Sequence, residues 1–188
     1  IAVTNGINGS CIITCSYEAR ASGIKTGMRF SDAKKLCPNL IKRSSRPYEY
    51  TKVSEKIMET LYSISPDIEI FSIDEAFIDL THCQKIYSSP INAAKLTKRR
   101  IFNKLNLPCS IGISGNKAVA KFAAKLVKPN GITIINPLDA EKILSKYLVT
   151  ELCGVSKGIQ KFLNYHNVFT CGDMKKIPVS ILGNKFGN

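Results

Sequence analysis

The chain has 188 residues, of which 44% are hydrophobic, and this composition excludes a disordered basic tail and predicts a folded protein with a hydrophobic core. Lys and Arg number 27 against 14 Asp and Glu, so the formal net charge is +13, which favours a polyanionic partner such as nucleic acid over a basic surface kept only for solubility. No apolar run reaches the roughly 20 residues of a membrane span, and the cysteines are scattered without a Cys-x-x-Cys pair. We therefore expect no membrane partner, no structural zinc and no disulfide framework.

The first part of the chain shows short strand and helix patterns separated by turn residues. The predicted elements are a strand at 1–5 ended by Asn5-Gly6, a strand at 12–15, a short helix in SYEARASGIKTGM closed by Gly23, and a helix capped by Ser31-Asp32 that runs through Leu36. Because the chain starts within a strand, lacks an initiator Met and stops at GNKFGN, we expect it to be a fragment of a longer protein.

The central part alternates amphipathic helices with strands. Apolar residues at 53, 57, 61 and 64 recur every three or four positions, which predicts a helix over 50–65. The elements predicted after it are strands in IEIFSI and AFIDL, a basic helix over 92–105, a strand over 109–114, a helix over 116–127 and a strand over 132–135. This order predicts a mixed sheet with helices on one face, an α+β fold. After Pro137 the pattern becomes helical and basic, and a domain boundary is expected there.

Two adjacent acids, Asp74 and Glu75, interrupt the apolar stretch FSIDEAFIDL. Such a stretch should form a buried strand or a tight pair of strands, where ionised carboxylates require a neutralising partner. Neighbours on a straight strand point to opposite faces, so both acids can reach one ion only at a turn or bulge. This arrangement suits Mg²⁺, and two ions about 3.5–4 Å apart would clamp the reacting oxygens of a phosphoryl transfer. The alternative is a surface hairpin tip with two solvated acids.

Two further segments could hold phosphate groups. In TCSYEAR, Tyr17 and Arg20 share a helix face and Thr14 adds a hydroxyl, so three donors gather; the alternative is an exposed helix with a local pair between Glu18 and an arginine. In KLVKPNG, Lys128 lies at a sharp helix exit. It either points over a nucleotide site or is favoured there only by the helix dipole.

A basic segment near the C-terminus, LCGVSKGIQKFL, could contact DNA. Its Gly-x-x-x-Gly turn leads into a helix whose N-terminal N–H groups can bind a phosphate. The residues concerned are Gly154, Ser156, Lys157, Gly158 and Lys161. The alternative is an ordinary corner between two helices.

Together and in this order, these motifs resemble the Y-family (lesion-bypass, DinB/UmuC-like) DNA polymerases over nearly the whole chain. The motifs are SYEARASGIKTGM, AKKLCPNL, FSIDEAFIDLT, GISGNKAVAKFAAKLVKPNG and GVSKGIQKFL. The stretches IAVTNG, CSYEARASGIKTGM, LVTELCGV and FTCGDM look most similar to the eukaryotic deoxycytidyl-transferase branch, whereas SIDEAF is closer to the wider family.

The resemblance implies small fingers at 1–45, a palm without its first strand at 46–136 and a thumb with a helix-hairpin-helix at 137–188. It implies that Asp74 and Glu75 hold two Mg²⁺ ions, or Mn²⁺, and that the triphosphate is bound by Thr14, Tyr17, Arg20 and Lys128. The implied activity is template-directed transfer of a nucleotide from dNTP, or dCTP in the transferase branch, to a primer 3′-OH in translesion synthesis. Implied partners are primer–template DNA and, through segments outside the chain, a replication clamp or other polymerase subunits. The implied location is the nucleus in a eukaryote and otherwise the cytoplasm, with DNA.

The chain also departs from the family pattern. The family's first catalytic aspartate and the aromatic residue that screens out ribonucleotides precede Ile1, and the C-terminal DNA-binding domain and the arginine of the transferase branch lie outside the chain as well. Ser156 replaces the second glycine of Gly-x-Gly, and its Cβ should weaken a phosphate contact that needs a positive φ. We therefore expect little activity from these residues alone. A non-catalytic DNA-binding or scaffold module on the same fold, and a metal-dependent nucleotide cyclase on a palm-like sheet, stay open.

Overall fold

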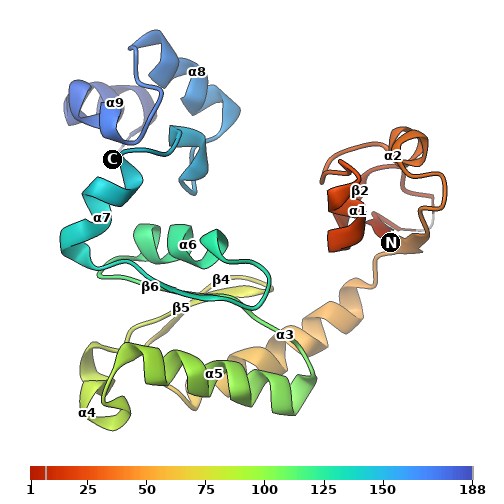
Figure 1. Ribbon diagram of the computed structural model, residues 1–188, viewed down its shortest axis with the longest axis horizontal. Helices are drawn as coiled ribbons and strands as arrows, with labels where there is room; N and C mark the ends of the chain where they lie inside the picture. Colours follow the sequence, from red (N-terminus) through yellow and green to blue (C-terminus); the bar gives the residue numbers. More distant parts are fainter. Residues whose placement is uncertain (7, 188) are drawn as a thin grey trace. The chain divides into compact units, whose positions relative to one another are not determined.

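The computed structural model describes residues 1–6 and 8–187 and divides into two compact units, Ile1–Glu55 and Lys56–Asn188 (Figure 1). The division falls within helix α3 (Pro47–Tyr62). Among the described residues, no helix combines the length and the apolar character that a bilayer crossing requires. The division into fingers, palm and thumb stays a prediction.

The first unit is built on a small mixed sheet. Strand β1 (Ala2–Thr4) lies between β2 (Ile12–Cys15), to which it is antiparallel, and β3 (Lys42–Ser44), to which it is parallel. Helix α1 (Tyr17–Ala21) begins where the Ser16 hydroxyl accepts a hydrogen bond from the Ala19 amide (3.4 Å). Gly23 then takes the positive φ, +85°, that ends this segment. The predicted strands and first helix are therefore confirmed, whereas β3 was missed.

The second helix of this unit begins earlier than its capping residues predict. Helix α2 spans Phe30–Leu36, so Ser31 and Asp32 lie inside its first turn and cap nothing. Phe30 starts the helix because its amide donates to the Ser10 carbonyl (2.7 Å) and its ring packs against the core of the unit. That core consists of Ala2, Ile12, Cys15, Ala19, Ile24, Ala33 and Leu40.

The second unit follows the predicted order of helices and strands. Its elements up to residue 134 are β4 (Ile68–Ser72), β5 (Glu75–Ile78), a 3₁₀ turn η1 (Thr81–Cys83), α4 (Gln84–Tyr87), α5 (Pro90–Leu105), β6 (Ile111–Ile113), α6 (Lys117–Leu126) and β7 (Ile132–Ile134). The predicted bounds were right to within a few residues, and the largest difference is at α3, which spans Pro47–Tyr62 where a helix over 50–65 was predicted. The short helix α4 was not predicted.

The strands of the second unit form two pairs. The β4–β5 pair is antiparallel and the β6–β7 pair is parallel. Met58 of α3, Leu61 of α3 and Ile101 of α5 form a core with the apolar side chains of β4 and β5. In Figure 1, α3 and α5 lie on one side of the strands and α6 on the other. The α+β class is confirmed, and the predicted placement of helices on one face holds for α3 and α5 but not for α6.

The chain after residue 136 is helical, as predicted. Its elements are α7 (Pro137–Leu144), the 3₁₀ turn η2 (Val149–Glu151), α8 (Lys157–Tyr165), the 3₁₀ turn η3 (Gly172–Lys176) and α9 (Val179–Phe186). The elements from η2 onward enclose a small core in which Val149, Leu163, Val168 and Ile177 are buried. Helix α7 instead packs its apolar residues against Val119, Phe122 and Ala123 of α6.

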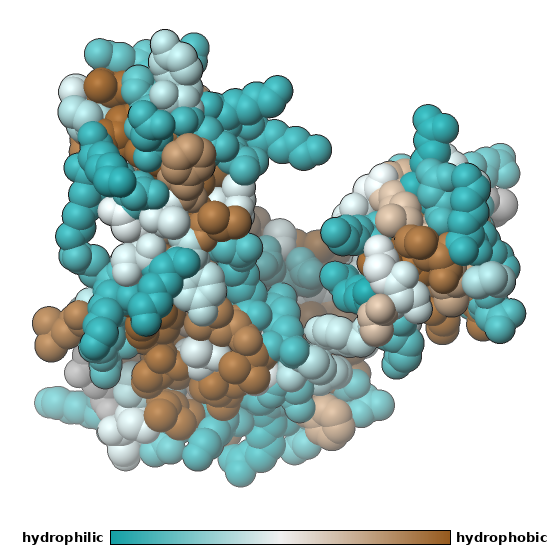
Figure 2. Space-filling model, turned by 45° about the horizontal axis from the view of Figure 1, so that its top comes forward, coloured by the Kyte–Doolittle hydropathy of each residue, from teal (hydrophilic) through white to brown (hydrophobic). Residues whose placement is uncertain are grey.

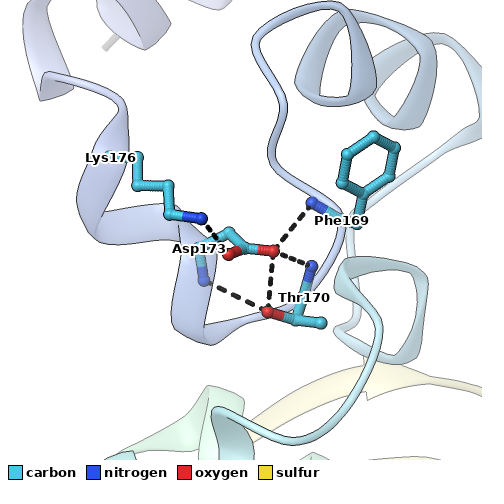
Figure 3. A network of polar contacts seen from close by, with 4 residues as sticks. All are labelled: Phe169, Thr170, Asp173 and Lys176. Atoms are coloured by element: carbon cyan, nitrogen blue, oxygen red, sulfur yellow. Dashed lines mark hydrogen bonds and ion pairs between the residues drawn. The ribbon is translucent and has the colours of Figure 1, made fainter.

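A dense polar network holds the loop between α8 and η3 (Figure 3). The Asp173 carboxylate accepts hydrogen bonds from the Lys176 ammonium (2.6 Å), the Thr170 amide and hydroxyl (both 2.8 Å) and the Phe169 amide (3.2 Å). The contact with Lys176, followed by the bonds from Thr170 and Phe169, holds the pKa of Asp173 well below its usual range. The network therefore ties this loop down directly after the buried Val168.

We expect Asp173→Asn to lower the stability of the helical segment after residue 136 near neutral pH. Because the folded pKa is depressed, the stabilisation by the carboxylate is present above the unfolded pKa of about 3.9 and is lost as the pH falls through the folded value. Thermal unfolding between about pH 7 and about pH 3 should therefore show a smaller acid-dependent loss in this variant than in the wild type. Asp139→Asn, which removes a carboxylate from α7, is the matched control; equal behaviour of the two variants would contradict the prediction.

Candidate functional site

The adjacent acids lie at a bend, as the sequence predicted. Asp74 lies in the turn between β4 and β5, and Glu75 is the first residue of β5. The pairing of the two strands shifts register between Ile70 and Ser72, directly before this turn. The Ser72 hydroxyl donates a hydrogen bond to Asp74 Oδ1 (2.9 Å). The break in the strand thus removes the opposite-face constraint that a straight strand would impose on the two carboxylates.

The prediction that the acids are buried was wrong. Asp74 and Glu75 are both exposed, and the neighbouring Ile70, Phe71 and Ile73 are about half exposed. Figure 2 shows hydrophobic residues (brown) gathered among hydrophilic ones (teal) on part of one face of the molecule. Because the turn lies at the end of the hairpin with little chain over it, the large desolvation cost that the apolar flanks suggest is not incurred.

The charge of Glu75 is balanced by a lysine that sequence reasoning missed. Lys121 of α6 places its Nζ 2.7 Å from Glu75 Oε2, and the Lys121 side chain is only 21% exposed. The same ammonium lies 4.1 Å from the centre of the Phe71 ring, a cation–π contact. One helical turn earlier, Lys117 Nζ lies 2.5 Å from Glu69 Oε2. The signal in the sequence was the spacing of the two lysines, which places both on one face of α6.

The turn can accept a divalent cation but cannot enclose it. Carboxylate oxygens at an exposed turn are donors that suit Mg²⁺, which retains waters and takes further oxygens from a substrate. Among residues 1–6 and 8–187, no group of three or more His, Cys, Asp or Glu side chains could hold a metal. A cation at Glu75 would also have to replace the Lys121 ammonium. The donor set therefore fits a metal shared with substrate and further oxygen ligands, and does not fit a structural metal site.

The first unit brings together three predicted phosphate donors. Arg20 donates from Nε to the Cys15 carbonyl (3.2 Å) and from one terminal nitrogen to the Thr14 hydroxyl (3.4 Å). Its guanidinium carbon lies 6.0 Å from the ring centre of Tyr17, which is 53% exposed. Among the ion pairs of the described residues there is none between Glu18 and an arginine, and the Ser16 hydroxyl lowers the pKa of Glu18. The geometry favours the donor cluster over the local ion pair.

Lys128 lies at the predicted helix exit. Helix α6 ends at Leu126, and Lys128 follows after the C-cap residue Val127 with its side chain exposed. The turn is tight, because a Cβ on Gly131 would lie 2.1 Å from the Val127 carbonyl oxygen. Lys128 is thus presented by a rigid turn in the same unit as the acids.

The basic segment near the C-terminus forms a turn followed by helix α8. Gly154 takes a φ of +95°, whereas Ser156 has a φ of −74° and caps α8 by accepting a hydrogen bond from the Ile159 amide (3.4 Å). The left-handed position is therefore Gly154, two residues before Ser156, and a weaker phosphate contact at Ser156 stays a prediction. Lys157 and Lys161 are exposed on α8, and Gly158 lies in its first turn.

A family model and several curated proteins are similar to this chain in sequence. The sequence model of the impB/mucB/samB family matches residues 1–125. The DNA polymerase IV of Pelotomaculum thermopropionicum is 38% identical over 176 residues, which cover 94% of this chain and 44% of that protein. The DNA polymerase IV of Lactococcus lactis subsp. cremoris is 42% identical over 176 residues, which cover 94% of this chain and 48% of that protein. The chain thus spans about half the length of the curated relatives it matches.

Solved structures agree with the sequence comparison. DinB from Sulfolobus solfataricus has a TM-score of 0.84 and 28% identity, with 100% of this chain and 55% of that chain covered. A structure described as an insertion ternary complex of Dbh DNA polymerase has a TM-score of 0.87 and 28% identity, with 100% and 56% covered. The polymerase IV and DinB relatives match the wider family that SIDEAF indicated, and the deoxycytidyl-transferase branch stays a prediction.

Proposed function

The chain belongs to the impB/mucB/samB family, the DinB/UmuC-like Y-family of DNA polymerases, and on this premise we propose that it carries much of the catalytic core of a translesion DNA polymerase. In the proposed reaction the primer 3′-OH gives up its proton to solvent water and its oxygen bonds to the α-phosphorus of an incoming dNTP, while the bond from that phosphorus to the oxygen bridging to the β-phosphate breaks and pyrophosphate leaves. The observation that carries the proposal is the pair of carboxylates at the β4–β5 turn.

Asp74 and Glu75 would hold the metal, as two Mg²⁺ ions or Mn²⁺. When bound, the metal stabilises the charge that develops on the attacking and leaving oxygens. The exposed turn supports this assignment because it leaves room for substrate oxygens beside the carboxylates. Lys121 would release Glu75 when the cation arrives and keep it neutralised beforehand.

Thr14, Tyr17, Arg20 and Lys128 would bind the triphosphate. The contacts of Arg20 with Cys15 and Thr14 pre-organise its guanidinium, so less side-chain entropy is lost when it binds phosphate. Tyr17 adds an exposed hydroxyl, and Lys128 adds a point charge from the turn after α6. These residues hold and orient the nucleotide and do not themselves move a proton.

The segment after residue 136 would bind the DNA backbone as a thumb. The α8 N-terminus with Gly154, Ser156, Lys157, Gly158 and Lys161 offers N–H groups and two ammonium groups to a phosphate. We further propose fingers at 1–45 and a palm at 46–136, location with DNA in the nucleus or a prokaryotic cytoplasm, and contacts with a replication clamp through other parts of the protein. Preference for dCTP would follow if the chain belongs to the transferase branch.

Primer extension tests the proposed function. The full-length protein that contains this chain should add template-complementary nucleotides with Mg²⁺ or Mn²⁺ and none with a chelator, and dCTP alone on templates with each base tests the branch. The 188 residues alone should bind DNA with a steep salt dependence, which a nucleotide cyclase would not show. They should extend poorly, because the described residues gather only two carboxylates at the turn. Tight DNA binding without any incorporation by the full-length protein would instead support the scaffold alternative.

A further inference from the structure

Lys98 of α5 makes a contact that its place on a basic amphipathic helix does not predict. Its ammonium donates to the Cys109 carbonyl (2.5 Å), the Asn130 carbonyl (2.7 Å) and Asn130 Oδ1 (2.5 Å). A lysine ammonium has three N–H donors, so each donor has an acceptor here. Within the part of the chain that the structure describes, Lys98 forms no ion pair with Asp or Glu. Its charge is instead directed at neutral oxygens.

The three hydrogen bonds join segments that are distant in sequence. Cys109 precedes β6, and Asn130 lies in the turn between α6 and β7, 32 residues after Lys98. Asn130 has a φ of +62°, a left-handed conformation that Asn tolerates better than most residues. The Lys98 ammonium therefore holds both the backbone and the side chain of the residue that reverses the chain.

The same turn is tied from its other side. The Gly131 amide donates to the Ser110 hydroxyl (3.3 Å), and the Ile111 amide donates to the Gly131 carbonyl (3.0 Å). Between these ties and the end of α6 lies Lys128, whose own side chain is exposed. The backbone that carries Lys128 is thus held at Asn130 and Gly131, and only the Lys128 side chain is left to reach a ligand.

We propose that Lys98 is a positioning residue for nucleotide binding: it holds the turn at residues 128–131 so that Lys128 is presented to the triphosphate. This inference rests on the proposed function, because it assumes that Lys128 binds the incoming dNTP. Lys98 itself touches no reacting atom. Loss of its contacts weakens nucleotide binding because Lys128 then spends time in orientations that do not meet the phosphates.

The test compares Lys98→Met with Arg100→Met in single-nucleotide insertion by the full-length protein. Met keeps the apolar stem and removes the ammonium. Arg100 lies on the same helix and likewise donates to a backbone carbonyl and a hydroxyl, those of Ser63, which lie away from the turn. Lys98→Met should raise the KM for dNTP about tenfold while kcat and the Kd for DNA stay within about twofold. Arg100→Met should change none of the three.

A double-mutant cycle isolates the route of the effect. In the Lys128→Met background, Lys98→Met should raise the KM by less than about twofold, since the side chain it positions is gone. Additive effects, or an unchanged KM in the single variant, would overturn the inference. Asn130→Gly approaches the contact from the other side: it keeps the left-handed backbone but removes Oδ1, and it should raise the KM about threefold. If Lys98→Met fails to fold, the KM of Asn130→Gly serves as the test of the positioning role.

Amide hydrogen exchange separates failure of this inference from failure of the proposed function. Exchange at the Gly131 and Ile111 amides, which donate the hydrogen bonds at this turn, should be faster in Lys98→Met than in the wild type or Arg100→Met, whether or not the protein incorporates nucleotides. If the wild type incorporates no nucleotide, the proposed function fails, and the exchange data still test whether Lys98 holds the turn at residues 128–131. If exchange is unchanged, or is faster while the KM stays at the wild-type value, the positioning role is refuted.

Discussion

Glu75→Gln should lower the rate of template-directed nucleotide incorporation by about a thousandfold or more, and Asp74→Asn should do the same, because under the proposed function each would remove a charged ligand for the cation that stabilises the transferring phosphoryl group. DNA binding should stay within about twofold, since both acids lie at the hairpin turn and not on the basic segment around α8. Single-turnover insertion and a parallel DNA titration measure the two quantities.

The hairpin offers a matched control for this prediction. Glu69 of β4 is paired with Lys117 as Glu75 is paired with Lys121, and both glutamates are about half exposed. Glu69→Gln therefore removes an equivalent ion pair from the same hairpin but leaves the turn intact, and it should keep the wild-type rate within about twofold. If Glu75→Gln is as active as Glu69→Gln, the non-catalytic scaffold alternative becomes the better account.

Gly112→Ala should destabilise the second unit by about 3 kcal/mol, because the added Cβ has no space. Gly112 lies in the middle of β6, and a Cβ there would come 1.9 Å from the Ala120 carbonyl oxygen and 2.4 Å from the Ala124 amide nitrogen. Both atoms belong to the backbone of α6, so no side-chain rotation relieves the clash and the helix must move away from the strand. Hydrogen exchange of the β6 and α6 amides is the measurement.

Gly158→Ala is the control for the loss of a glycine. The nearest atom to a Cβ at Gly158 is the Ser156 hydroxyl oxygen at 3.8 Å, and the residue lies in helix α8. Ala is favoured over Gly in a helix by roughly 0.5–1 kcal/mol, so this variant should be as stable as the wild type or slightly more so. Comparable destabilisation by the two substitutions would show that β6 and α6 are not in such close contact.

The contact between Lys121 and Glu75 changes the charge balance at the hairpin turn before a metal binds. A partly buried lysine that lies over Phe71 and pairs with Glu75 balances one of the two negative charges at the turn, so the two adjacent carboxylates repel each other less. A metal that binds Glu75 would then have to displace the Lys121 ammonium, so its net gain in binding free energy is smaller than at an unpaired glutamate. In this respect the second interpretation of the sequence, a hairpin tip with accessible acids, describes the structure and is compatible with a metal-binding role.

Local patterns in the sequence predicted much of the fold and part of the site. The apolar spacing of α3 and turn glycines such as Gly23 specify elements through neighbours only a few residues away, and most of those elements are present. The bend at Asp74 and the grouping of Tyr17 with Arg20 were predictable for the same reason. Strand β3 was missed because a three-residue strand has no period of its own and exists only through its pairing with β1.

By itself, then, the sequence determined the order of helices and strands, the turn that carries two acids and the basic segments suited to phosphate. Only the tertiary structure decided that the acids are exposed, that Lys121 neutralises Glu75 and that Lys98 holds the turn before Gly131. The physical reason is distance along the chain. Capping and periodicity act over three or four residues, whereas these contacts join residues 46 and 32 positions apart and exist only once α5, α6 and the hairpin have packed together.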